Sequence, residues 1–192
     1  EAVQAMMGLA SEGDLVRGQL DTVGFALTRA QAEDVHRAAL AAVGEALAAQ
    51  DARLGMAPGD GFAAVVVPHD DHLYAARVAV HASERIAAPR VLLLGVFHPA
   101  RDWDLADRLV FDAFTAWHGP WGPVRTDPLR GELLAALPEG DVVVSNAMHE
   151  REHSLEGLIP LLQARQPELT IIPVLVPTMG WFHEGHLSLM RL

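Results

Sequence analysis

The sequence predicts an α/β fold in which a largely parallel or mixed sheet is flanked by helices in three layers. Strand-sized apolar runs alternate with segments of helical pattern through most of the 192-residue chain. Strands that alternate with helices of about 10–15 residues indicate βαβ units around a parallel sheet. Apolar residues make up 51% of the chain, which at this length is enough to build one sizeable core.

The N-terminal part, residues 1–59, is expected to be a helical segment. Thr28 and Gln31 have the spacing of a capping box, and the Ala- and Leu-rich sequence from there to about Ala52 has a helical period. Gly and Pro at 55–61 break that pattern. The α/β core is expected over 60–178 and an atypical tail over 179–192. The core elements are expected in the order strand 62–67, helix 72–87, strand 90–97, strand 108–111, loop 117–124, helix 128–137, strand 141–147, helix 152–165 and strand 169–176.

Composition excludes several classes of site. The absence of cysteine excludes disulfides and thiolate metal sites, and the absence of lysine excludes a Schiff-base or phosphate-binding lysine. A formal charge of −11 argues against nucleic acid as a partner, since phosphates need a basic face.

No apolar run approaches the roughly 18 residues of a membrane span, and no signal peptide is visible. We therefore expect a cytoplasmic protein with a small-molecule or peptide ligand; the oligomeric state is open.

Three histidines, His69, His98 and His149, each directly follow a run that is predicted to be a strand. In an open α/β sheet ligands bind beyond the carboxyl ends of the strands, so this edge is a candidate metal or acid/base site. Neighbouring strands end only about 5 Å apart, which allows His69 and His98 to share a metal. A loop histidine bonded to backbone is the alternative for either alone. Asp70 and Asp71 are candidate ligands or orienting groups, but capping of the next helix is favoured.

The segment from His149 to His153 contains His-Glu-x-x-His, which as a bare pattern is the helix motif of zinc proteases. Here it spans a predicted strand-to-helix junction, so we interpret the match as accidental. Glu152 and Glu156 are expected in the first turns of the following helix, where negative charge complements the helix dipole. His153 is either a donor in the pocket or a packing histidine, and the pocket role is favoured.

At these residues the chain resembles the Memo-like family, also named AmmeMemoRadiSam system protein B. The resemblance covers roughly residues 60–178, and the motifs occur in the order of the family. They are PH…Y at 68–74, LGxxH at 94–98, PWGPV…D at 120–127, EHSLE at 152–156 and IIPVLV at 171–176.

The resemblance implies a fold similar to that of the LigB-type extradiol dioxygenases. It implies that His69 and His98 match the two histidines of a metal-like pocket and that Tyr74 is its tyrosine. In the related dioxygenases the corresponding pair binds non-haem Fe(II) with a carboxylate, and a catechol ring is opened by O₂ with the help of another histidine. Here Asp70 and Asp71 stand where the family usually has Ala-Gly.

The family domain continues well past the last predicted strand, so the resemblance implies an incomplete Memo/LigB-type domain. Its third ligand and its base are then absent or supplied by substitutes such as His153 or Asp71. Residues 177–189 resemble the HxGH nucleotide-binding signature of pantothenate synthetase, which in that family lies near the amino terminus. We interpret it here as a chance or chimeric terminus, although His183 and His186 could ligate adventitious metal.

The preferred hypothesis is a Memo-like protein that binds a divalent metal through His69 and His98, with His153 and Tyr74 as catalytic residues. The metal is Fe(II), with Cu or Zn as alternatives, and any activity is that of an extradiol dioxygenase-like oxidoreductase. Whether the protein is an enzyme is left open. One alternative is a non-catalytic module of the same fold that binds a small ligand or peptide. The other is a fragment of a pantothenate synthetase-like, ATP-dependent ligase.

Overall fold

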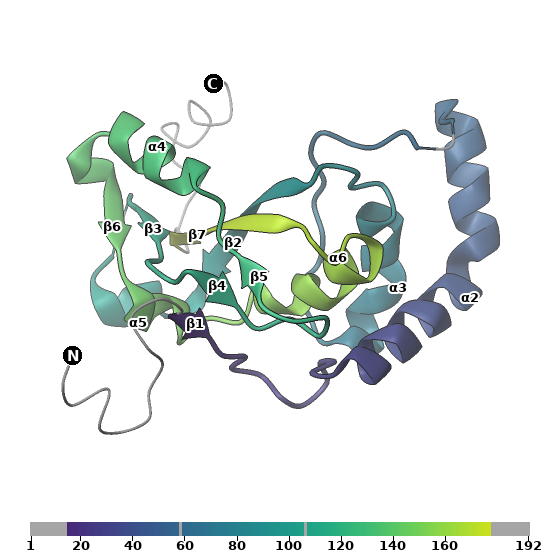
Figure 1. The fold of residues 1–192 in the computed structure, drawn as a ribbon, viewed down its shortest axis with the longest axis horizontal. Helices are drawn as coiled ribbons and strands as arrows, with labels where there is room; N and C mark the ends of the chain where they lie inside the picture. The colour runs from purple at the N-terminus through teal and green to yellow at the C-terminus, as the bar shows by residue number, and fades with distance from the viewer. Residues whose placement is uncertain (1–14, 58, 106, 178–192) are drawn as a thin grey trace.

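A computed structural model describes residues 15–57, 59–105 and 107–177 of the chain (Figure 1). Its helices and strands are β1 (Val16–Arg17), α2 (Arg29–Leu54), α3 (His72–Ser83), β2 (Arg90–Phe97), β3 (Leu109–Phe111), β4 (Ala116–Trp117), β5 (Val124–Arg125), α4 (Leu129–Ala136), β6 (Val142–Val144), α5 (Asn146–His149), α6 (Ile159–Arg165) and β7 (Thr170–Pro177). Short 3₁₀ turns occupy His98–Trp103, Glu139–Asp141 and Glu156–Leu158. The predicted α/β class is confirmed. No helix in the described ranges is long and apolar enough to cross a membrane.

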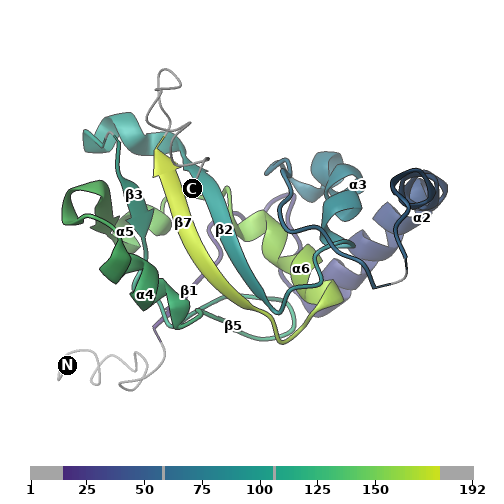
Figure 2. The same cartoon turned by 90° about the horizontal axis from the view of Figure 1, so that it is seen from above.

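The main sheet has four strands in the order β2-β7-β3-β6 and is mixed (Figure 2). β2 pairs with β7 in parallel and β3 with β6 in parallel, whereas β3 and β7 are antiparallel. A small second sheet has the order β1-β4-β5. An isolated bridge from Thr126 to Ile171 connects the chain just after β5 to β7. β7 is therefore the strand around which the domain is organised.

Successive side chains of β7 point to opposite faces of the sheet, and both sets are buried. Ile171 and Leu175 join the larger core with α6, while Ile172 and Val174 pack with Phe111 against the leucines of α4. α4 thus covers one face, and α6 with the small sheet covers the other. α2 and α3 add an outer helical layer by packing on α6 through a separate apolar cluster (Figures 1 and 2).

Helix α2 begins and ends at the signals that its sequence contains. Thr28 is the N-cap, and its side chain and that of Gln31 form the predicted capping box. Gly55 ends the helix in the left-handed conformation, with φ of 65°, which a residue without Cβ adopts at little cost.

The strand predicted at 62–67 is wrong. These residues form no strand and pair with none in the described chain, and a hollow of about 450 Å³ is lined by them and by β2. β2 is the edge strand of the sheet, and its Leu92 and Leu94 are exposed along with Val66. The Val- and Ala-rich composition favours a strand, but a strand also needs a neighbour that composition alone does not identify.

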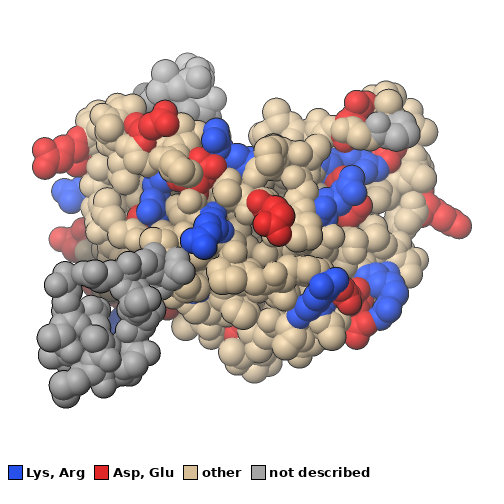
Figure 3. Space-filling view, in the orientation of Figure 1, with Lys and Arg blue, Asp and Glu red and all other residues tan. Residues whose placement is uncertain are grey.

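Charged side chains on the face drawn in Figure 3 form small interspersed groups of arginines and carboxylates around a broad uncharged area. In the described chain, ion pairs such as Arg29 with Glu33 on α2 and Arg85 with Asp51 join charges of opposite sign. This face therefore lacks the continuous basic surface that binding of a phosphate backbone needs. The expectation about nucleic acid stays a prediction for the molecule as a whole.

Candidate metal site

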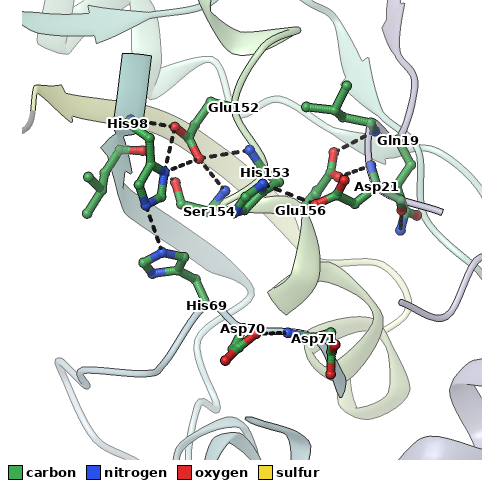
Figure 4. A network of polar contacts seen from close by, with 12 residues as sticks. Gln19, Asp21, His69, Asp70, Asp71, His98, Glu152, His153, Ser154 and Glu156 are labelled. Atoms are coloured by element: carbon green, nitrogen blue, oxygen red, sulfur yellow. Dashed lines mark hydrogen bonds and ion pairs between the residues drawn. The ribbon is translucent and has the colours of Figure 1, made fainter. Parts of the chain in front are cut away.

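The structure brings together three histidines from different parts of the chain (Figure 4). His98 is the first residue after β2, His69 precedes α3, and His153 lies between α5 and the 3₁₀ turn Glu156–Leu158. The ring centroids of His69 and His98 are 5.1 Å apart, those of His98 and His153 5.3 Å, and those of His69 and His153 6.1 Å. One ring nitrogen from each residue lies within 4.8 Å of the other two.

The nitrogen spacing fits a single first-row metal ion. The Nε2 atoms of His69 and His98 are 3.3 Å apart. Two imidazoles bound tetrahedrally at metal–nitrogen distances of about 2.0–2.1 Å have nitrogens about 3.3–3.4 Å apart. His98 is exposed and the other two are half-buried, so the cluster is reachable from solvent. The His153 nitrogen lies within 4.8 Å of the pair, so a shift of up to about 1.5 Å brings it to the same spacing.

Glu152 orients His98 from the side opposite the cluster. Its buried carboxylate accepts from the backbone N–H of His98 at 2.7 Å and from His98 Nδ1 at 3.0 Å. It also accepts from the backbone N–H groups of His153 and Ser154, each at 2.8 Å. Burial alone would raise the pKa of Glu152, but the backbone N–H groups of His98 and Ser154 outweigh it and lower the pKa. An ionised Glu152 can only accept, so His98 carries its proton on Nδ1 and presents the Nε2 lone pair to the cluster.

Crowding favours the neutral form of His69, which is the form that binds a metal. Burial, followed by the neighbouring His98 and His153, lowers the pKa of His69 below its ordinary value of 6.5. In the metal-free protein the short contact with His98 is then a hydrogen bond in which His69 Nε2–H donates. A metal ion bound by both Nε2 atoms would require the proton of His69 to lie on its Nδ1 instead.

A buried ion pair between Arg17 and Glu156 holds the loop that carries Glu152 and His153. Arg17, which is 2% exposed, contacts Glu156 at 2.5 Å and donates to the carbonyl oxygens of His149 at 2.8 Å and Glu152 at 2.6 Å. The Arg17 guanidinium lies 4.3 Å from the centre of the Trp117 ring. The side chain of an N-terminal residue therefore clamps a loop more than 130 positions away in the sequence.

Gly95 on β2 lets the same loop approach the sheet. A Cβ atom at this position would lie 2.5 Å from Ser154 Oγ and 2.6 Å from Leu155 Cδ2, which is closer than real side chains pack. Ser154 Oγ donates to the carbonyl of Val96 at 2.8 Å. The glycine of the LGxxH motif thus serves the placement of the loop that carries His153.

His149 does not belong to the cluster, and the His-Glu-x-x-His pattern does not form the site. It is fully buried, its Nε2 contacts the carbonyl of Val110 at 3.1 Å, and its ring packs edge-on against Trp117. Its Nδ1 has no hydrogen-bond partner in the described chain. Burial, with smaller contributions from Arg17 and Arg130, lowers the pKa of His149 to about 4. His149 is a packing residue of the core.

The other predicted site residues lie apart from this cluster or are otherwise engaged. Asp71 caps α3, as favoured, by accepting from the backbone N–H of Tyr74. Tyr74 itself is 65% exposed on the first turn of α3, and its catalytic role stays a prediction. The HxGH-like segment, with His183 and His186, lies outside the described residues.

Sequence reasoning missed the roles of Glu152 and Glu156. Both were expected as first-turn residues of a helix from 152, yet α6 begins only at Ile159, after the 3₁₀ turn. In the structure they are 2% and 3% exposed, and their carboxylates bind backbone N–H groups and, for Glu156, Arg17. The EHSLE block was the available signal, because it places two acidic residues close together beside an apolar run. Acidic side chains are buried only when they are paired, so the block could have indicated buried partners for both.

The chain is similar in sequence to proteins of one family. The model of the family described as Memo-like protein matches residues 41–181. The MEMO1 family protein of Aquifex aeolicus is 33% identical over 116 residues, which are 59% of this chain and 41% of that protein. The MEMO1 family protein of Methanococcoides burtonii is 34% identical over 100 residues, 51% of this chain and 34% of that protein. The chain therefore matches less than half of the length of these relatives. Since the family model matches well over half of it, the chain belongs to the Memo-like protein family.

Proposed function

We propose that this Memo-like domain binds one divalent transition-metal ion through His69, His98 and His153. The observation that carries the proposal is the convergence of three imidazole nitrogens within 4.8 Å, two of them at the 3.3 Å spacing of metal ligands. The buried Glu152 carboxylate on His98 Nδ1 supports it, because metal-binding histidines commonly donate their second ring N–H to a carboxylate.

The donor set determines which metals fit. Imidazole nitrogen suits Zn, Cu, Fe and Ni, whereas Mg and Ca need oxygen ligands. A three-histidine site on the surface leaves at least one coordination position open to water or a ligand. When bound there, the ion would supply Lewis acidity, and Fe or Cu would also supply redox chemistry. The protein would hold His98 in the tautomer that presents its Nε2 lone pair, and the lowered pKa of His69 would keep that ring neutral.

Dioxygenase-like chemistry on an aromatic diol is the finer proposal, and it rests on the resemblance to the LigB-type enzymes. The described donors are three imidazoles, whereas the non-haem iron enzymes of this kind use two histidines and a carboxylate. Glu152 does not fill that role, because its oxygens are engaged by His98 and by backbone N–H groups. An oxygenase would therefore need a carboxylate from outside the described residues or would work with three imidazoles.

Measuring the metal content of the loaded protein tests the proposal directly. Protein loaded anaerobically with Fe(II), Cu(II) or Zn(II) and then desalted is expected to retain about one ion per chain, measured by elemental analysis. His69→Ala/His98→Ala is expected to lose that ion, because it removes both closely spaced donors. His36→Ala/His81→Ala is the matched control, since those rings contact Glu84 and Gln50 instead. Equal metal in the parent and in His69→Ala/His98→Ala would refute the site.

A non-catalytic binding module is the second candidate, and the apolar hollow between residues 62–67 and β2 favours it. Exposed Leu92 and Leu94 border a space of about 450 Å³, which is within the usual range for small-ligand pockets. An apolar ligand or peptide whose affinity is unchanged by a chelator, and is lost in Leu92→Asp/Leu94→Asp, would support this function. Loss of binding on metal removal would instead place the ligand at the histidines.

A further inference from the structure

The N-terminal segment reaches the histidine cluster, although it lies outside the residues matched by the family model. β1 pairs with β4 and places Arg17 in the core. From there the chain runs to Asp21, whose backbone N–H donates to the buried Glu156 carboxylate at 2.7 Å. The side chain of Gln19 donates to the Asp21 carbonyl at 2.9 Å. The backbone of Asp21 is thus held on both sides of its Cα.

The side chain of Asp21 contacts His153. Its Oδ2 lies 3.1 Å from His153 Nδ1, and the two side chains are each 40% exposed (Figure 4). A carboxylate that accepts from Nδ1–H leaves Nε2 with its lone pair free. This is the arrangement that Glu152 imposes on His98, made by a residue from the opposite end of the chain.

We propose that Asp21 is a positioning residue that fixes the ring orientation and tautomer of His153 so that its Nε2 faces His69 and His98. The part of this inference that concerns metal affinity rests on the proposed function. His153 has few other constraints, since its backbone N–H is held by Glu152 but its ring is only half-buried. Without Asp21 the imidazole would lose the carboxylate that holds its Nδ1–H and would favour the Nε2–H tautomer.

The ring itself can be observed without any metal. In the metal-free protein at pH 8.5, long-range ¹⁵N–¹H correlation spectra are expected to show His153 mainly with its proton on Nδ1. Asp21→Ala is expected to shift the proton to Nε2, whereas Asp34→Ala, an exposed control on α2, leaves His153 unchanged. The backbone contact of Asp21 with Glu156 is kept in Asp21→Ala, so the loop should remain in place. An unchanged His153 tautomer in Asp21→Ala would overturn the inference.

Metal affinity provides a second readout through a double-mutant cycle. Zn(II) is expected to bind about 10–100-fold more weakly to Asp21→Ala than to the parent, the usual cost of losing a carboxylate behind a ligating histidine. In a His153→Ala background the same substitution is expected to have no further effect, because the residue it positions is gone. An equal loss in both backgrounds would overturn the inference. A parent that binds no Zn(II) would overturn the proposed function, while the tautomer would still decide the role of Asp21.

Discussion

Replacing Arg17 with methionine is expected to lower the free energy of unfolding by about 3–5 kcal/mol, the range for breaking a buried ion pair from one side. The substitution keeps an apolar stem of similar length but leaves the Glu156 carboxylate buried without its cation. It also removes the donors to the carbonyl groups of His149 and Glu152. The backbone N–H groups of Leu20 and Asp21 would then be the remaining partners of Glu156.

Denaturant unfolding followed by circular dichroism measures this effect. Arg37→Met is the matched control, because Arg37 pairs with Asp34 on the exposed face of α2 and such pairs contribute little. Arg17→Met/Glu156→Gln is expected to recover part of the loss, since no uncompensated charge remains. A midpoint for Arg17→Met that equals the one for Arg37→Met would show that the buried pair does not stabilise the loop.

Acidification from pH 6.5 to pH 4 is expected to destabilise the protein through His149 by up to about 3 kcal/mol. The unfolded chain takes up a proton on this histidine near its ordinary pKa of 6.5, whereas the native protein does so only at a pKa of about 4. Between these values the unfolded state binds more protons, so the free energy of unfolding falls as the pH falls. The cause is burial of an imidazole whose Nδ1 has no acceptor in the described chain.

His149→Gln separates this contribution from those of other titrating groups. Glutamine has an amide N–H₂ that can still donate to the Val110 carbonyl, but it does not titrate in this range. The difference in stability between parent and variant is therefore expected to shift in favour of the variant as the pH is lowered from 7 to 4. A difference that stays constant over this range would mean that the native protein protonates His149 as readily as the unfolded chain does.

The fold class followed from the sequence because alternation of apolar runs and helical patterns is local information. The capping box at Thr28 and the strands near 90–97 and 169–176 were predicted for the same reason. The unpaired segment 62–67 was not, because its composition is that of a strand and only the tertiary arrangement leaves it without a partner.

The candidate site was predictable only in part. His98 does follow the end of a strand, β2, as the rule for ligand sites at strand ends assumes. His69 joins it in the cluster although residues 62–67 form no strand, so the premise that predicted its position was wrong. His149 was predicted closer to such an end than His153, yet His149 packs in the core and His153 joins the cluster. The clamp made by Arg17 could not be found from sequence spacing, because its partners lie more than 130 residues away.

X-ray absorption spectroscopy of the Zn(II)-loaded protein tests the central claim most directly. The sample would carry His183→Ala and His186→Ala, so that imidazoles of the C-terminal residues do not contribute. The expected spectrum contains three imidazole nitrogens at about 2.0–2.1 Å, falling to two in His153→Ala. An imidazole count that is unchanged by replacing His69, His98 or His153, or a coordination shell of oxygen alone, would contradict a metal site at these three histidines.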